Sequence, residues 1–293
     1  MITLSTVTPI YRGEKYLRQL VERLEKIRDD WEKNQAPVSL YESIFVDDNS
    51  IDGSKTLLQE LAESRPWISI VTLSRNFGQH SATIAGICHS QGDWIVTLDE
   101  DMQHDPGYIE AMLKQAVCNN ADLVYANPLQ KVHGGGWRDN ASVWTKKILS
   151  RLSGIKAMPL FNSFRLIRGG IARAAASSGS SYTYLDVAFT WFTCSISSLD
   201  ISMHDERYSG EGKSGYSLLK LIDHARKLIM SSNVDFAKWG IMLGLAAIVL
   251  SVFLAGWVLV GYFLFPQTIQ APGWASLLAT VALFSGTIIG LIT

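Results

Sequence analysis

Two kinds of hydrophobic pattern alternate along the first 126 residues. Short apolar runs rich in β-branched and aromatic residues predict strands, and apolar residues spaced three or four positions apart predict helices. The expected strands are 2–8, 39–46, 67–73, 94–98 and 122–126, and the expected helices are 14–28, 55–63, 81–90 and 107–118. This order predicts an α/β fold with a mostly parallel sheet and helices on both faces. The helix at 81–90 consists mainly of small residues, which would let it pack close to the sheet.

The pattern changes near the C-terminus. Residues 240–265 are uncharged and mostly apolar, and this segment is long enough to cross a bilayer core of about 30 Å. After a short loop at 266–273, residues 274–293 form a second apolar segment that ends without a polar flank. We therefore expect two transmembrane helices, the second one truncated. A buried core helix is the alternative for each segment.

Charge divides the chain at the same place. The 26 Lys and Arg and the 27 Asp and Glu give a net charge of -1, and all of them lie at or before Lys238. This balance argues against general nucleic-acid binding. Arg226, Lys227 and Lys238 precede the first apolar segment, which predicts a multi-pass plasma-membrane protein whose soluble part is cytoplasmic. The expected organisation is a soluble domain at 1–215, an amphipathic juxtamembrane region at 216–238 and membrane helices at 239–293.

An acidic segment follows the predicted strand at 94–98. Asp99, Glu100, Asp101 and Gln103 crowd the point where that strand ends. Carboxylates this close repel one another unless a positive charge neutralises them, and oxygen ligands on alternate residues suit Mg²⁺ or Mn²⁺. Ligands of α/β sheets bind at the carboxyl ends of strands. The segment therefore predicts a metal site, with a solvated acidic turn as the alternative.

A second acidic pair, Asp47 and Asp48, ends the strand at 39–46. A carboxylate there can accept from a nucleotide base or a ribose hydroxyl. Capping of the next helix is the alternative, and Ser50 or Asp52 would serve that better. The chain has neither Gly-x-Gly-x-x-Gly after its first strand nor a P-loop. A bound nucleotide would therefore need a metal to meet its diphosphate charge.

Six motifs occur in the order and spacing typical of a known family. They are Thr8-Pro9-Ile10-Tyr11, Val46-Asp47-Asp48-Asn49-Ser50, Ser74-Arg75-Asn76-Phe77-Gly78-Gln79-His80, Ala85-Gly86, Gly92-Asp93 and Leu98-Asp99-Glu100-Asp101-Met102-Gln103. Over residues 2–238 the chain resembles family 2 glycosyltransferases, and more closely the branch that acts on polyprenyl phosphates, such as the bactoprenol glucosyltransferases.

The resemblance implies a GT-A fold and an inverting, metal-dependent hexosyltransferase. The expected donor is a nucleoside-diphosphate sugar, with UDP favoured over GDP, and the expected acceptor is a polyprenyl phosphate lipid. An oligomer is also favoured. The implied donor-nucleotide residues are Pro9, Tyr11, Asp47, Asp48 and Asp99, and the implied ligands of Mg²⁺ or Mn²⁺ are Asp99, Asp101 and Gln103. The family usually has Asn-Glu after the Tyr, whereas Arg12 and Gly13 stand here and Glu14 comes one place later.

The resemblance also implies an acceptor side. Residues 162–166 are similar to the family's Ser-Gly-Phe-Arg segment, so Ser163 and Arg165 would meet the acceptor phosphate; a structural salt bridge is the alternative for Arg165. Residues 204–217 are similar to its Arg-x-x-Gly-x-Ser-x-Tyr segment, with one extra residue, which adds Arg207 and Lys213. The candidate catalytic residues are Asp101, Arg165 and Arg207.

Two further segments keep two interpretations each. The glycine-rich loop at 131–138 would close over a ligand or is a plain surface loop. The helix expected at 216–229 would lie on the membrane surface or pack between the domain and the first span.

Two other functions remain as alternatives. A processive polysaccharide synthase usually has a Gln-x-x-Arg-Trp segment before its membrane spans, and this chain has none. A non-catalytic membrane scaffold would be expected to have lost the Asp-x-Asp motif, which is intact here.

Overall fold

The computed structural model describes residues 1–128, 150–151, 153–178, 183–201 and 236–264, together with six isolated positions between 273 and 284. The chain divides into two compact units, Met1–Ser232 and Asn233–Thr293. Each unit is described by itself.

A sheet of seven strands forms the centre of the first unit, in the order β3-β2-β1-β4-β6-β5-β7. The strands are β1 (Ile2–Ile10), β2 (Val38–Asp47), β3 (Ile68–Thr72), β4 (Trp94–Thr97), β5 (Leu123–Pro128), β6 (Arg165–Arg168) and β7 (Ile196–Ile201). The four strands from β3 to β4 are parallel, and β5 pairs in parallel with β7. Among the described strands, only β6 runs antiparallel to its neighbours, β4 and β5. The predicted mostly parallel sheet is confirmed.

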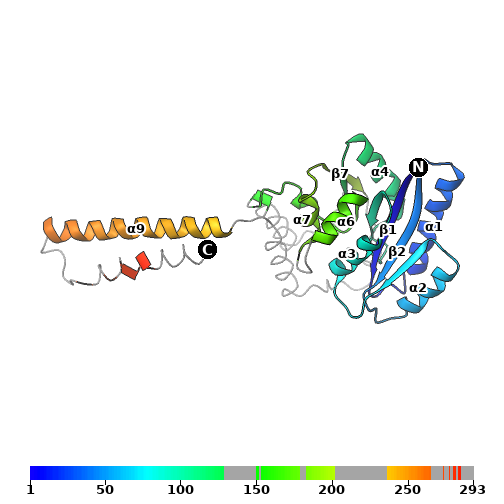
Figure 1. Cartoon of the computed structure of the whole chain (residues 1–293), viewed down its shortest axis with the longest axis horizontal. Helices are drawn as coiled ribbons and strands as arrows, with labels where there is room; N and C mark the ends of the chain where they lie inside the picture. The colour runs from blue at the N-terminus through cyan, green and yellow to red at the C-terminus, as the bar shows by residue number, and fades with distance from the viewer. Residues whose placement is uncertain are drawn as a thin grey trace. The chain divides into compact units, whose positions relative to one another are not determined.

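Helices cover both faces of this sheet (Figure 1). They are α1 (Leu17–Lys33), α2 (Ser54–Glu63), α3 (Gln79–His89), α4 (Ile109–Cys118), α6 (Gly169–Ser178) and α7 (Leu185–Thr190), with the short 3₁₀ helices η1 (Pro106–Tyr108) and η2 (Met158–Leu160). One buried apolar cluster joins the sheet to α1, α2 and α4, and a second joins it to α3, α6 and α7. The expected elements at 2–126 are present, with ends shifted by a few residues.

The start of α1 shows why one boundary moved. The expected helix began at residue 14, but α1 begins at Leu17. The Gly13 N–H donates to Ser54 Oγ at 3.0 Å, and the Glu14 N–H donates to Asp52 Oδ2 at 3.3 Å. These bonds to the first residue of α2 and to the loop before it hold residues 13 and 14 outside the helix.

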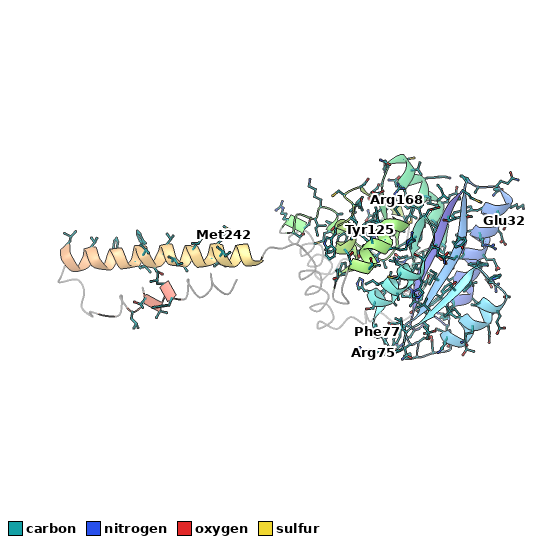
Figure 2. All side chains as sticks on the ribbon, in the orientation of Figure 1. Glu32, Arg75, Phe77, Tyr125, Arg168 and Met242 are labelled. Atoms are coloured by element: carbon teal, nitrogen blue, oxygen red, sulfur yellow. The ribbon has the colours of Figure 1, made fainter. Side chains whose placement is uncertain are left out.

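The second unit contains α9 (Phe236–Leu264). Apolar side chains along it are exposed, among them Met242 (Figure 2), Val249 and Trp257. No helix in the described part of the chain combines the length and apolar character needed to cross a membrane. The expected span at 240–265 falls almost wholly within α9, whereas the segments at 216–229 and 274–293 lie wholly or mostly outside the described residues.

The helix α3 packs closely on β1 and β2, as its small residues predicted. A Cβ added at Gly86 would lie 2.4 Å from Cγ1 of Val7 and 2.9 Å from Cγ2 of Val46. Both of these valines are fully buried strand residues whose side chains have no room to withdraw. The glycine therefore sets the distance between α3 and the sheet.

Replacing Gly86 by Ala is expected to lower the free energy of unfolding by about 1–3 kcal/mol, because the added methyl overpacks this contact. Urea unfolding followed by far-UV circular dichroism measures the change. Gly170→Ala in α6 is the control: its Cβ would meet nothing within 4 Å, so stability should stay level or rise by up to about 1 kcal/mol. Equal stability of the two variants would contradict the close packing.

Candidate active site

The predicted donor-side residues come together at one edge of the sheet, which we call the site edge: the carboxyl ends of β2, β1 and β4. These three strands are adjacent and parallel, so their ends meet there. Ile10 pairs with Asp47 in the register, and the Asp48 N–H donates to the Ile10 carbonyl at 2.8 Å. Asp99 follows β4 at the same edge. The sequence thus predicted correctly which segments meet.

Asp47 closes the turn after β2. Its Oδ1 accepts from the Ser50 N–H at 2.8 Å and from the Ser50 hydroxyl at 2.5 Å, and the side chain is buried. Asp47 does not cap α2, in line with the expectation, but its buried carboxylate has another local task, because it closes this turn. Asp52 has a related task at the start of α2, where it accepts from the Ser54 N–H at 3.1 Å.

Asp48 holds the loop that precedes α3. Its two oxygens accept from the Phe77 N–H at 2.7 Å and the Gly78 N–H at 2.8 Å. Gly78 has a φ of 89°, in the left-handed region that glycine adopts readily because it has no Cβ. Phe77 is half-exposed, and the Arg75 guanidinium lies 4.7 Å from its ring centre (Figure 2). Asp48 therefore holds the backbone of the loop that carries Phe77 at the site edge.

Asp99 is held by donors from two other parts of the unit. Its Oδ1 accepts from Gln79 Nε2 at 2.5 Å, at the start of α3. Its Oδ2 accepts from the Ser163 hydroxyl at 2.7 Å, in the loop before β6. His104 completes the surroundings: its Nδ1 accepts from the Asp99 N–H at 3.2 Å, and its ring stacks on Phe164 with centres 4.9 Å apart. The orientation of the Asp99 carboxylate is thus fixed on both oxygens.

The acidic turn continues through Asp101. The Gln103 N–H donates to Asp101 Oδ1 at 3.2 Å, and Met102 between them has a φ of 60°. Within the described ranges, no three His, Cys, Asp or Glu side chains form a cluster able to hold a metal ion by themselves. Two carboxylates and an amide oxygen are nevertheless ligands of the type that Mg²⁺ and Mn²⁺ accept, and both ions commonly complete their shell with ligand oxygens and water. By ligand type alone, these three side chains fit a divalent metal ion.

Glu100 binds the β1–α1 loop. Its carboxylate accepts from the Tyr11 N–H at 2.7 Å and from the Arg12 N–H at 3.1 Å. Burial raises the pKa of Glu100, and the bonds from these two N–H groups oppose that rise. The displaced Glu14 does something else: it accepts from the Gly53 N–H at 2.9 Å. The departure from Asn-Glu therefore ties Glu14 to the β2–α2 loop.

Arg165 lies in the interior, where it pairs with Asp186 of α7. The residue is only 2% exposed, and its guanidinium lies 5.1 Å from the ring centre of Phe189. Burial works to lower the pKa of Arg165, but the charge of Asp186 and the other nearby groups outweigh it, so the pKa is raised. The geometry favours the structural salt bridge over the direct phosphate contact, because a buried, paired guanidinium presents almost no surface to a ligand.

Of the other acceptor-side candidates, the structure describes Ser163 but not Arg207 or Lys213. Ser163 lies at the site edge on Asp99, as described above. Arg207, Lys213 and the loop at 131–138 lie outside the described residues. Sequence reasoning assigned no role at the site to Gln79, Glu100 or Asp186. For Asp186 a signal existed, because a carboxylate inside the apolar run 184–189 requires a buried partner.

A large groove lies elsewhere on the unit. It has a volume of about 1330 Å³ and is bordered by Trp31, Trp67 and the first residues of β1 and β2. It lies at the amino ends of the strands and contains none of the predicted site residues. The carboxyl edge remains the better candidate, since open α/β sheets bind ligands there.

Comparison with known proteins identifies the family of this chain. A family model described as glycosyl transferase family 2 matches residues 5–174. An undecaprenyl-phosphate 4-deoxy-4-formamido-L-arabinose transferase of Proteus mirabilis (strain HI4320) is 29% identical over 284 residues, which cover 96% of this chain and 83% of the relative. The protein of the same name from Edwardsiella ictaluri (strain 93-146) is 31% identical over 222 residues, or 75% of this chain and 64% of the relative, which is less than two thirds of its length.

A solved structure shares the fold. Glucosyl-3-phosphoglycerate synthase from Mycobacterium tuberculosis, crystallised with Mn²⁺, uridine diphosphate and phosphoglyceric acid, aligns with a TM-score of 0.54 at 15% identity, covering 78% of this chain and 77% of that chain. At this identity the likeness concerns the fold alone. The chain belongs to glycosyl transferase family 2 and is a glycosyltransferase with a GT-A-like α/β fold.

Replacing Glu100 by Ala is expected to speed hydrogen exchange at the Tyr11 and Arg12 amides, because both lose their acceptor. The free energy of unfolding should fall by about 1 kcal/mol, since water can partly replace the lost carboxylate. Hydrogen exchange with mass spectrometry of the peptide covering 9–14 measures the effect.

Glu110→Ala in α4 is the matched control for Glu100→Ala. It removes an exposed ion pair with Lys114, worth at most about 0.5 kcal/mol, and should leave exchange at 9–14 unchanged. Unaltered exchange at these amides in the Glu100 variant would show that the hydrogen bonds from the Tyr11 and Arg12 N–H groups to Glu100 are not present in solution.

Proposed function

We propose that this glycosyltransferase transfers a sugar from a nucleoside-diphosphate donor to the phosphate of a polyprenyl lipid. The observation that carries the proposal is the 2.7 Å bond between Ser163 and Asp99, which joins the acceptor-side segment to the donor-side segment at one edge of the sheet. The two relatives described above are named for transfer to undecaprenyl phosphate. That acceptor is our proposal for this chain.

The donor nucleotide would bind across the ends of β1 and β2. In this proposal Pro9 and Tyr11 line the base pocket, while Asp47 and Asp48 hold the turn and the Phe77 loop that border it. A uridine nucleotide is favoured, and the fold neighbour crystallised with uridine diphosphate is consistent with it. Asp99 would face the donor at the end of β4.

Asp101, with Asp99 and Gln103, would hold Mg²⁺ or Mn²⁺ against the donor diphosphate. The ion, when bound, supplies positive charge that offsets the charge of the diphosphate leaving group. The side chains of this chain set its place: Gln79 and Ser163 orient Asp99, and the Asp101–Gln103 turn is closed by its own hydrogen bond.

The reaction needs no strong general base. A phosphate oxygen of the acceptor is already ionised at neutral pH, so it can attack the anomeric carbon directly. The new bond joins that carbon to the acceptor phosphate, and the bond to the nucleoside diphosphate breaks with its electron pair leaving on the diphosphate. In-line attack inverts the anomeric configuration. The chain would contribute mainly by positioning both substrates and excluding water, with Arg207 and Lys213 as proposed phosphate contacts.

The acceptor places the reaction at a membrane surface. We propose that the chain associates with the plasma membrane through its second unit and acts on the cytoplasmic side. Supporting this are the many exposed apolar side chains of α9, including Leu243, Val249 and Phe253, which a water-soluble helix would cover.

Replacing Asp101 by Asn is expected to lower the rate of lipid-linked sugar formation by at least about 100-fold, the scale seen when one electrostatic contact to a developing charge is lost. The assay uses full-length protein in detergent with undecaprenyl phosphate, MnCl₂ and a panel of radiolabelled UDP- and GDP-sugars. Product is counted after organic extraction, so that donor hydrolysis is scored separately.

The matched control is Asp105→Asn, which makes the same charge change four residues away. The Asp105 side chain accepts from the Gly107 N–H at 2.9 Å, and an Asn side chain can make the same bond, so activity should stay within about twofold. Full activity of the Asp101 variant would overturn the proposed site. Wild-type protein that hydrolyses no donor and glycosylates no lipid would favour the non-catalytic scaffold.

A further inference from the structure

A buried polar network lies behind the acceptor-side loop, which we define as residues 161–164. Arg165 of β6 donates through Nη1 to Asp186 of α7, and the Tyr125 hydroxyl of β5 donates to the same Asp186 oxygen at 2.7 Å. The three residues are 2%, 1% and 0% exposed. Tyr125, labelled in Figure 2, is among the largest fully buried side chains. Arg165, Asp186 and Tyr125 together are called the buried triad below.

The triad is connected to the acceptor-side loop by a main-chain contact. Arg165 Nη1 also donates to the carbonyl of Asn162 at 3.1 Å. The next carbonyl, that of Ser163, accepts from the hydroxyl of Thr97 in β4. Two successive carbonyls are therefore held by side chains of two different strands. Between them these contacts fix the direction of the Ser163 side chain, whose hydroxyl reaches Asp99.

Stability alone is a weak explanation for the triad. Removing two charges and a hydroxyl from water is costly, and buried ion pairs can often be replaced by apolar residues without loss of stability. The cost is visible here: Arg165 Nε is buried and has no hydrogen-bond partner among the residues that the structure describes. An arrangement that leaves a charged donor unsatisfied calls for another reason to be kept.

We propose that Arg165 is a positioning residue. Together with Asp186 and Tyr125 it holds the Asn162 carbonyl, and through it directs the Ser163 hydroxyl onto Asp99. The triad would thus set the orientation of a donor-side carboxylate from the interior of the fold, without touching either substrate. The inference rests on the proposed function, because the orientation of Asp99 is taken to serve the binding of the donor nucleotide.

The first test replaces the whole triad by apolar residues: Tyr125→Phe, Arg165→Met and Asp186→Leu together. No buried charge is left unpaired, so the variant is expected to keep a melting temperature close to that of wild type. Hydrogen exchange of the peptide covering 160–165 should nevertheless rise, and affinity for uridine diphosphate with Mn²⁺, measured by calorimetry, should fall about tenfold, as for the loss of one strong hydrogen bond. Wild-type exchange and wild-type affinity in this variant would overturn the proposal.

A second variant guards against misfolding of the triple replacement. Thr97→Val keeps the triad intact and removes only the bond to the Ser163 carbonyl, so it should raise exchange at 160–165 and weaken uridine diphosphate binding in the same direction. If Thr97→Val changed neither quantity, the direction of Ser163 would not depend on these anchors and the proposal would fail.

A double-mutant cycle distinguishes positioning from general support. Ser163→Ala is expected to weaken uridine diphosphate binding clearly in the wild-type background, but by less than about twofold in the apolar-triad background, because the hydroxyl is already misdirected there. The control background is Arg168→Met, an exposed residue of the same strand, in which Ser163→Ala should keep its full effect. Equal effects of Ser163→Ala in all three backgrounds would show that the triad does not act through Ser163.

These measurements separate the two proposals. Hydrogen exchange at 160–165 needs no ligand. It therefore tests whether the buried triad holds the acceptor-side loop even if the protein transfers no sugar to a polyprenyl phosphate. Absence of lipid-linked product from wild-type protein would end the proposed function and leave the positioning role to be judged by exchange. Normal transfer by wild type and by the apolar-triad variant alike, with unchanged exchange, would end only the inference.

Discussion

One antiparallel strand decides which residues meet at the site. Because β6 runs against β4, Thr97 at the end of β4 pairs with Arg165 at the start of β6. The loop before β6 therefore lies at the same edge of the sheet as the carboxyl ends of the parallel strands β1, β2 and β4. A parallel β6 would have carried Ser163 to the opposite edge, away from Asp99. The contact between Ser163 on the acceptor side and Asp99 on the donor side depends on the antiparallel direction of β6.

The site edge is also rigid for a physical reason. Three carboxylates along it are bound by N–H groups or side chains from other segments: Asp48 by the segment before α3, Glu100 by the β1–α1 loop and Asp99 by Gln79 and Ser163. Repulsion between these neighbouring charges is offset by such donors. The same bonds fix the loops relative to one another. The acidic residues thus organise the loops around the site edge.

The sequence was sufficient to predict the strands and helices up to residue 126, because the apolar residues in those segments recur at spacings typical of a strand or a helix. It also located Asp47, Asp48 and Asp99 at strand ends, and parallel order brings such ends together. It did not predict β6, a four-residue strand with arginine at both ends, nor β7 and α7. Strand direction and long-range donors such as Gln79 depend on tertiary pairing, which local patterns do not contain.

Arg165 illustrates the limit of motif reasoning. An arginine in a segment resembling an acceptor-binding motif was expected to contact phosphate, with a salt bridge as the alternative. The deciding partner, Asp186, lies 21 residues further along the chain. Its position inside an apolar run indicated a buried carboxylate, and two such charges in one chain are most stable when paired. Considering the two residues together would have pointed to the interior.

Photo-crosslinking with an azido-uridine diphosphate in the presence of Mn²⁺ tests the central claim most directly, because it maps where the nucleotide binds. The account predicts modified peptides from the site edge, covering 9–12, 47–50 or 75–79, and their loss when excess uridine diphosphate is added. Specific labelling confined to the groove beside Trp31 and Trp67, at the other edge of the sheet, would contradict it.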